Sequence, residues 1–256
     1  MMTTTNRSAP RRLLLTGAAG RIGSAFFMDA RERYWFRLAD REPIPLVDAA
    51  SGGHEVIALN VADPEACQEG CRGIDTVVHL AADPSPEADF YDSLLENNIK
   101  GTYNIFRAAA DQGCRRVIFA SSIHAVVGHP PEMSIPADAP VRPMNMYGVS
   151  KGFGEALAAC FAHDGALSSI AIRIGAYDAA WLRPSPPPDA MSVFLSHRDM
   201  NQLLGRCIDV ENLPFAIVHG ISNNRVQRLN LSSTRELLGY APEDDAFDLF
   251  ATPGGD

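Results

Sequence analysis

The sequence predicts a doubly wound α/β fold, in which helices cover both faces of a parallel sheet. Short apolar runs alternate with segments of helical spacing as far as Gly175. The apolar runs are nearly continuous, which is typical of strands that are buried on both faces of a parallel sheet. A glycine-rich turn joins the first of these runs to the first helical segment. Strand–helix–strand units of this kind take right-handed connections.

Each element of the first half has its own signal. Residues 12–16 are a short apolar run that ends at a glycine, which predicts a buried strand. Residues 22–30 carry apolar side chains at helical spacing. Pro64 begins a helix, because proline suits the first helical turn. The strands expected here are 12–16, 35–40, 55–59 and 75–80, with helices over 22–30 and from 64 to about 71.

The alternation continues up to Gly175. A long helical stretch over 89–112 leads into an apolar strand over 116–120. A second long helix, over 147–163, separates that strand from the next one, over 170–174. We therefore expect residues 1–175 to form the main domain.

The pattern changes after Gly175. Residues 176–190 are loop-like, and four prolines lie close together at 184, 186, 187 and 188. We interpret this segment as a loop that covers whatever the sheet binds. A helix over 196–210, a strand over 214–219 and a helix over 232–238 ended by Gly239 are expected to follow. Residues 176–256 thus form a small substrate-binding and covering region rather than an independent domain.

Composition excludes several classes of function. The chain has 46% hydrophobic and 21% charged residues, which suits a soluble globular domain with a large core. Its formal net charge of −9 gives nucleic-acid binding no electrostatic support. No apolar run approaches the roughly 20 residues of a membrane span. The five cysteines form no Cys-x-x-Cys pair, so we expect buried, reduced thiols, a cytoplasmic location and no metal site.

The glycine-rich turn has the spacing of a dinucleotide-binding loop. It reads Thr16-Gly17-Ala18-Ala19-Gly20-Arg21-Ile22-Gly23 and lies between a strand and a helix. Gly17 allows the tight turn, Gly20 lets the backbone approach a pyrophosphate, and Gly23 lets the helix pack on the strand. The helix N-terminus supplies free N–H groups and a partial positive charge. The turn therefore predicts a Rossmann fold that binds a dinucleotide.

Asp40 selects among dinucleotides. It ends the second expected strand, at the distance from the glycine turn where an acidic residue binds the ribose 2′-hydroxyl. A carboxylate there repels a 2′-phosphate, so we expect NAD rather than NADP. Arg41 keeps the alternative open, because its guanidinium could pair with that phosphate.

Tyr147 and Lys151 form the strongest candidate for acid–base chemistry. The chain has 22 basic residues, and only Lys100 and Lys151 are lysines. Residues four apart share a helix face, so the phenol and the ammonium lie side by side. A nearby cation favours the phenolate and lowers the tyrosine pKa toward the range of a general base. Taken alone, the pair is weak evidence, because an ordinary surface pair on a helix has the same spacing.

The motifs together resemble a known superfamily. The glycine turn, Asp40, the run 79–82 (His-Leu-Ala-Ala), Asn98, the pair 121–122 (Ser-Ser) and Tyr-x-x-x-Lys at 147–151 occur in one fixed order. They look like the extended short-chain dehydrogenase/reductase superfamily. The resemblance covers roughly residues 11–240. It implies a Rossmann fold, NAD as the cofactor and hydride transfer as the chemistry.

The resemblance also implies roles for particular residues. Tyr147 would take the proton from a substrate hydroxyl, Lys151 would hold the nicotinamide ribose, and Ser122 would orient the reacting oxygen. His79 is expected to be a satisfied core histidine, and Lys100 a solvated surface residue. The cofactor-binding residues would be Gly17, Gly20, Arg21, Ile22, Gly23, Asp40, Arg41, Asn60, Val61, Leu80, Ala81, Ala82, Asn98, Tyr147, Lys151 and Ile174.

A closer resemblance concerns the substrate. The stretches 116–124, 147–155, 173–175 and 194–199 look like the bacterial uronate dehydrogenases, which oxidise a hexuronic acid at its anomeric carbon with NAD. The positions that face the substrate in that subgroup depart from it here: Ile123 replaces an asparagine, Ala176 a serine, a position near Ala190 an arginine, and one around Pro84 a serine. Arg183 is the possible substitute for the arginine. The expected substrate-binding residues are Ser122, Ile123, His124, Ala176 and Arg183.

Three functions follow from these residues. The first is an NAD-dependent dehydrogenase of a free sugar, a uronic acid or a related hydroxy compound. The second is a nucleotide-sugar epimerase or dehydratase with tightly bound NAD, which the residues after Ser122 and the short region after Gly175 disfavour. The third, a dinucleotide sensor without catalysis, is disfavoured by the intact Ser-Tyr-Lys set. We also expect a homodimer, paired through the helices over 89–112 and 147–163 by analogy with the superfamily.

Overall fold

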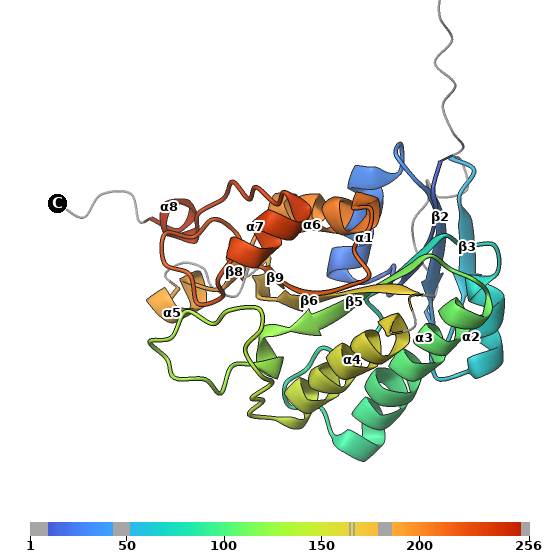
Figure 1. The fold of residues 1–256 in the computed structure, drawn as a ribbon, viewed down its shortest axis with the longest axis horizontal. Coiled ribbons are helices and arrows are strands. Elements are labelled where there is room, and N and C mark those ends of the chain that lie inside the picture. Colours follow the sequence, from blue (N-terminus) through green and yellow to red (C-terminus); the bar gives the residue numbers. More distant parts are fainter. Residues whose placement is uncertain (1–9, 43–51, 164, 166, 179–185, 252–256) are drawn as a thin grey trace, which may run out of the picture.

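Seven strands form one parallel sheet in the computed structural model (Figure 1). The structure describes residues 10–42, 52–163, 165, 167–178 and 186–251. The strand order is β3-β2-β1-β4-β5-β6-β9, and it reverses at β1, which pairs with β2 on one side and with β4 on the other. The predicted doubly wound fold is confirmed. The strands are β1 (Arg12–Thr16), β2 (Trp35–Asp40), β3 (Glu55–Ala58), β4 (Thr76–His79), β5 (Arg116–Ser122), β6 (Ser168–Ile174) and β9 (Phe215–Gly220).

Helices cover both faces of this sheet, as Figure 1 shows. One face carries α1 (Arg21–Ala30), α6 (His197–Asp209) and α7 (Ser232–Leu238), and the other carries α2 (Pro64–Cys71), α3 (Gly101–Asp111) and α4 (Met146–Ala162). Each face has its own buried apolar cluster, the first around Phe26 and Phe36 and the second around Phe106 and Phe119. Asn145 caps α4, because its side chain accepts a hydrogen bond from the Gly148 amide at 2.7 Å.

Two segments differ from the predicted elements. The long helix expected over 89–112 is divided into a π-helix, η1 (Phe90–Lys100), followed by α3, since helical spacing alone does not distinguish the two kinds of turn. The expected loop over 176–190 contains β7 (Ala176–Tyr177) and the start of α5 (Pro188–Met191). β7 pairs with β8 (Phe194–Leu195) in a separate two-stranded sheet. The remaining short helices are η2 (Ile123–Ala125) and α8 (Ala246–Leu249).

The cysteines depart from expectation at one position. Cys160 is exposed on α4, whereas Cys67, Cys71, Cys114 and Cys207 are buried, and all five thiols are free. Among the described residues, none of the helices has the length and apolar content needed to cross a membrane.

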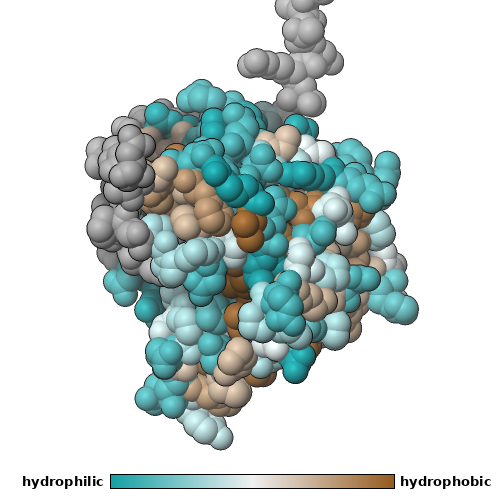
Figure 2. Space-filling model, turned by 90° about the vertical axis from the view of Figure 1, so that its left-hand side faces the viewer, coloured by the Kyte–Doolittle hydropathy of each residue, from teal (hydrophilic) through white to brown (hydrophobic). Residues whose placement is uncertain are grey.

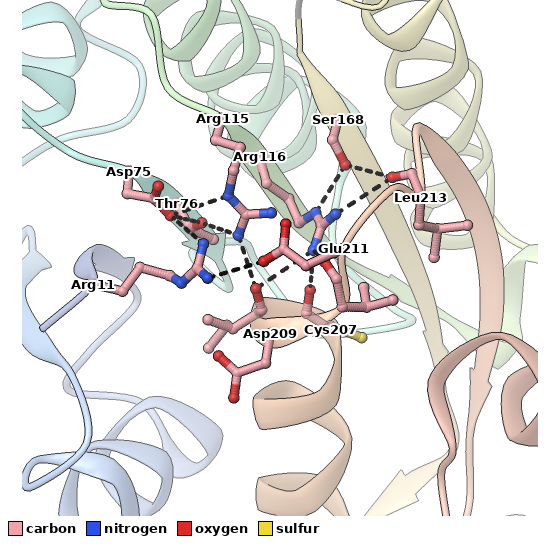
Figure 3. A network of polar contacts seen from close by, with 12 residues as sticks. Arg11, Asp75, Thr76, Arg115, Arg116, Ser168, Cys207, Asp209, Glu211 and Leu213 are labelled. Atoms are coloured by element: carbon pink, nitrogen blue, oxygen red, sulfur yellow. Dashed lines mark hydrogen bonds and ion pairs between the residues drawn. The ribbon is translucent and has the colours of Figure 1, made fainter. Parts of the chain in front are cut away.

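An arginine network lies at the amino ends of β4, β5 and β6 (Figure 3). Arg116 is 1% exposed, and its guanidinium donates to the carbonyl oxygens of Cys207 at 2.8 Å and Val210 at 2.6 Å. Arg115 donates to the Ile208 carbonyl oxygen at 2.8 Å. These bonds satisfy carbonyl groups that the last turn of α6 leaves without partners. The C-terminal end of helix α6 is thereby fixed to the amino ends of these strands, while ligands are expected at the carboxyl ends.

Candidate active site

A cavity of about 1420 Å³ lies at the carboxyl ends of the strands. The segments that follow β1, β2, β3, β4, β5 and β6 all contribute to its lining. Figure 2 shows this side of the molecule, with hydrophobic residues in a groove near the centre of the face. The strand order reverses at β1, which is one of these strands. Open α/β sheets bind ligands at such switch points.

The glycine turn after β1 has the shape that a pyrophosphate requires. Gly17 has φ +71°, and a Cβ there would lie 2.8 Å from the Ala81 amide nitrogen. A Cβ at Gly23 would collide with the Gly17 carbonyl oxygen. Gly20 precedes α1 and has no side chain to cover the first amide groups of the helix. The turn therefore leaves a helix N-terminus open to an anion, and these residues fit a dinucleotide.

Asp40 lies against this turn at the end of β2. Its Oδ2 accepts a hydrogen bond from the Ala19 amide at 3.0 Å, and its Oδ1 accepts one from the Arg41 amide at 2.8 Å. The carboxylate is thus held at one end of the cavity, beside Asn60 and Val61. This is the arrangement expected for a group that binds the adenosine ribose.

Ser122, Tyr147 and Lys151 meet at the opposite end of the cavity. Ser122 ends β5, Tyr147 lies in the first turn of α4, and a hydrogen bond joins the two side chains. The Lys151 Nζ lies 5.5 Å from the centre of the Tyr147 ring. A Cβ at Gly148 would collide with the His124 carbonyl oxygen, so only glycine lets α4 approach η2 this closely. That approach brings Tyr147 to Ser122.

Burial dominates the proton affinities of the pair. Burial raises the pKa of Tyr147, the hydrogen bond with Ser122 lowers it, and the charge of Asp83 raises it. Burial also lowers the pKa of Lys151 to about 8. The expected depression of the tyrosine pKa by Lys151 is therefore wrong for the chain by itself, because desolvation of the phenol outweighs the groups around it.

Asn98 lies behind the cavity wall rather than in it. It is buried on η1, and its Nδ2 donates to the Ser150 Oγ and to the Asp83 carbonyl oxygen, both at 3.1 Å. Its Oδ1 accepts from the Asp83 amide at 2.8 Å. Asn98 thus ties the loop after β4 to the helix that carries Tyr147. Its place among the cofactor-binding residues stays a prediction, and its hydrogen bonds position residues that line the cavity.

His79 is only half satisfied. Its Nδ1 shares a hydrogen bond of 2.8 Å with the Thr16 Oγ1, but its Nε2 has no partner within the described residues. Burial, and to a smaller extent the charge of Lys151, lower the pKa of His79 to about 3. The ring is therefore neutral, and the expectation of a fully satisfied histidine is wrong.

The expected substrate-binding residues lie near the reacting end. Ile123, His124 and Ala176 line the cavity together with Ser122, whereas Arg183 lies outside the described residues. The His124 ring stands edge-on to the Tyr147 ring at 5.5 Å, and burial lowers the His124 pKa. The expected cofactor-binding residues other than Asn98 also line the cavity.

The sequence patterns missed part of the lining. Asp83, Ser93 and Asn97 line the cavity close to Tyr147 but belong to none of the motifs. Two signals could have found them. Asp83 directly follows the run 79–82, and Ser93 and Asn97 lie four residues apart in a helical stretch.

Comparisons with known proteins agree with this geometry. A family model described as the NAD dependent epimerase/dehydratase family matches residues 13–191. The NAD-dependent glucose-6-phosphate dehydrogenase of Haloferax volcanii is 36% identical over 91% of this chain and 94% of its own length. The uronate dehydrogenase of Pseudomonas putida is 33% identical over 92% of this chain and 85% of its own. The structure of an Agrobacterium tumefaciens uronate dehydrogenase mutant complexed with NAD is similar at a TM-score of 0.84, with 32% identity over 97% of this chain and 92% of that one.

Proposed function

The chain belongs to the NAD-dependent epimerase/dehydratase family, and from this premise we propose that it is an NAD-dependent dehydrogenase of the short-chain dehydrogenase/reductase type. Its substrate is a free sugar, a sugar acid or a related hydroxy compound. The observation that carries the proposal is the single cavity that the glycine turn, Asp40 and the Ser122–Tyr147–Lys151 set line together. The names of the relatives, which are dehydrogenases of a sugar phosphate and of uronates, support a substrate without a nucleotide.

The chemistry assigns one task to each residue. NAD, held by the glycine turn, Asp40 and Lys151, would supply the hydride acceptor for oxidation of the substrate carbon. Tyr147 accepts the proton of the substrate hydroxyl on its phenolate oxygen, and returns it in the reverse direction. Ser122 donates a hydrogen bond to the same substrate oxygen and orients it. Lys151, next to the phenol, would hold the nicotinamide ribose.

An epimerase or dehydratase of the same family has less support. Ser122 is followed by Ile123 and His124, and both line the cavity where a dehydratase would require acids next to the catalytic hydroxyl. The region after Gly175 is also small, and its strand β9 joins the main sheet. We therefore propose that residues 176–256 cover the site of the domain over 1–175 without forming a domain of their own.

We further propose a homodimer that pairs through η1, α3 and α4. The exposed faces of these helices carry large apolar side chains, among them Tyr103 and Val149. Ile99, Tyr103 and Phe153 line a shallow hollow of about 480 Å³ on the same side. Exposed apolar surface of this kind is typical of a surface that associates.

NADH absorbance tests the proposed activity. The purified protein is given NAD and a panel of sugars and uronates, and steady NADH formation is expected with at least one of them. Tyr147→Phe should lower kcat/KM on the order of 100- to 10,000-fold, because the proton acceptor is lost. Tyr91→Phe, an exposed tyrosine on η1, is the matched control and should leave the rate unchanged.

Two results would contradict the proposal. Turnover of a nucleotide-sugar without net NADH would identify an epimerase or dehydratase. Near wild-type activity of Tyr147→Phe would remove the phenol from its role.

A further inference from the structure

Three side chains form a polar wall next to the reacting end of the cavity. Asp83 lies in the loop after β4, and Ser93 and Asn97 lie four residues apart on η1. We refer to these three residues as the acceptor wall. Asn98 bonds both the Asp83 backbone and the Ser150 Oγ, and that hydroxyl donates to the Tyr147 carbonyl oxygen at 2.7 Å, so the wall is tied to the helix turn that carries the proposed reacting phenol.

The acceptor wall is held rigidly. The Asp83 backbone is clamped on both sides by Asn98, through its amide at 2.8 Å and its carbonyl oxygen at 3.1 Å. The Asp83 carboxylate accepts from the Ser93 hydroxyl at 2.5 Å and from the Ser85 amide at 2.9 Å. The Asn97 Nδ2 donates to the Ser93 carbonyl oxygen and hydroxyl, both at 3.1 Å. A fixed group of this kind binds a ligand without losing conformational freedom.

The hydrogen-bond inventory shows which ligand groups fit. The Ser93 hydroxyl is spent on Asp83, and the Asn97 amide donors are spent on Ser93. The carboxylate of Asp83 keeps free lone pairs, and the Asn97 Oδ1 has no hydrogen bond to another described residue. The wall therefore offers acceptors and no free donors. Hydroxyl groups satisfy such a surface, whereas a carboxylate or phosphate meets only other acceptors.

The other side of the reacting centre places apolar side chains beside His124. Ser122 ends β5, which lies between β4 and β6 in the sheet. The acceptor wall follows β4, whereas Ile123, Ala176 and Val193 line the cavity from η2, β7 and the segment after α5. A sugar ring presents hydroxyl groups at its rim and C–H groups on its faces, so a cavity that combines hydrogen-bond acceptors with apolar side chains suits it.

Among the described arginines that line the cavity, the one outside the glycine-turn end is already engaged. Arg228 lines the cavity, but its guanidinium donates to the carbonyl oxygens of residues 129, 130, 131 and 133. Arg21 and Arg41 lie at the glycine-turn end. An anionic substrate would thus meet the Asp83 carboxylate without a free guanidinium from the described residues beside it.

We propose that Asp83, Ser93 and Asn97 bind the hydroxyl groups of a neutral sugar and select it over a sugar that carries a carboxylate or phosphate. This inference rests on the proposed dehydrogenase function and assigns its substrate class. Asp83 is the specificity-determining residue, since it supplies both the attraction for hydroxyl groups and the repulsion of anions.

Sugar pairs that differ only at C6 test the selection directly. With wild-type enzyme and NAD, kcat/KM is measured for glucose against glucuronate and glucose 6-phosphate, and for galactose against galacturonate. The neutral sugar should be preferred by about 10-fold or more, as expected when a ligand meets one unpaired buried charge. A preference for the uronate or the phosphate would overturn the inference and leave the dehydrogenase function standing. Absence of NADH with every sugar would overturn both.

Variants of the wall assign the selection to its residues. Asp83→Asn should lower kcat/KM for the neutral sugar about 10- to 100-fold. It should also lower the ratio of this value to kcat/KM for the matching uronate or sugar phosphate. Asp92→Asn removes the same charge from an exposed site on η1 and should change neither value. Asn97→Ala leaves Asp83 in place and should lower kcat/KM for the neutral sugar alone. An unchanged ratio of neutral to anionic substrate in both wall variants would contradict the assignment.

The pH profile supplies a readout that a purely structural role would not move. Tyr147 is faced by Lys151 from its own helix, by His124 from η2, by Ser122 from β5 and by Asp83 from the loop after β4. Because the negative charge of Asp83 raises the pKa of Tyr147, Asp83→Asn should lower it. The phenolate then persists at lower pH, and the acid limb of kcat/KM moves toward lower pH. An acid limb that stays in place would place Asp83 away from the phenol and overturn the inference.

Discussion

Lys151 shows how one residue can reveal a site before its surroundings are known. It is one of two lysines in a chain whose other basic residues are arginines. The second, Lys100, is exposed and pairs with Glu96 at 2.6 Å. Lys151, by contrast, is 4% exposed and lies between the rings of Tyr147 and Phe119. A compact ammonium can be desolvated and tuned in such a place, whereas a guanidinium keeps its proton and its planar fork.

Asp40 carries the first residue-scale prediction. Asp40→Ala should lower kcat/KM for NAD by about 10-fold, because the variant lacks the charged acceptor for the ribose hydroxyl. Its loss also removes the repulsion of a 2′-phosphate, so the ratio of NAD to NADP activity should fall. Initial rates with both cofactors measure this ratio. Asp29→Asn, an exposed acid on α1, should not alter it, and an unchanged ratio in Asp40→Ala would exclude the ribose assignment.

The residues found from sequence and those missed differ in a physical way. The grouping of Ser122, Tyr147 and Lys151 in one cavity was predictable from motifs that resemble a known superfamily. Asp83, Ser93 and Asn97 were not, because their role depends on which lone pairs remain free after the wall has formed. The raised pKa of Tyr147 was missed for a related reason, since burial is a property of the fold and not of the spacing.

At the scale of elements, the packing of α4 on β5 decides the geometry of the site. A Cβ at Gly154 would collide with the ring of Phe119, the same ring that lies under the Lys151 ammonium. Glycine at this position therefore lets the helix that carries Tyr147 and Lys151 lie close to the sheet. Any shift of α4 away from β5 moves both side chains relative to Ser122.

Gly154→Ala should consequently lower both stability and activity. We expect the free energy of unfolding to fall by about 1–3 kcal/mol, as in other overpacked cores. Displacement of the reacting groups by about 1 Å should cost on the order of 100-fold in kcat. Denaturant unfolding and steady-state rates measure the two effects.

Gly152→Ala on the same helix is the matched control. Its Cβ would lie 3.3 Å from a methyl group of Val141, a side chain that can move. Alanine in a helix is also favoured over glycine by about 1 kcal/mol, so this variant should keep wild-type stability and rate. Equal losses in the two variants would show that the Phe119 contact does not set the position of α4.

Element boundaries were predictable where apolar periodicity was long and were not where elements were short. The seven strands of the main sheet lie within a few residues of their expected positions, since buried parallel strands are continuous apolar runs. The two-residue strands β7 and β8 have no comparable signal. The π-helical turns of η1 leave the apolar spacing close enough to that of an α-helix to be missed.

The amino and carboxyl ends of the parallel strands differ in what surrounds them. Where β4, β5 and β6 begin, Arg115 and Arg116 bind the last carbonyl groups of α6 and close the sheet (Figure 3). Where the strands end, their loops surround the cavity. The network at the amino ends holds the strands in register. The loops at the carboxyl ends can therefore hold functional residues without being needed for the stability of the fold.

The last prediction concerns association of the whole chain. The layer of η1, α3 and α4 leaves Tyr103 48% and Val149 43% exposed, beside the hollow that Phe153 lines. A homodimer through this layer should have a mass near twice 27.7 kDa by light scattering. The double variant Tyr103→Glu, Val149→Glu should sediment as a monomer, because it places charges where an interface of about 1,600 Å² would bury them. Leu237→Glu, an exposed apolar residue on α7 in the opposite layer, should leave the dimer intact. A monomeric wild-type protein would exclude the homodimer. A dimer that only Leu237→Glu dissociates would place the interface in the opposite layer.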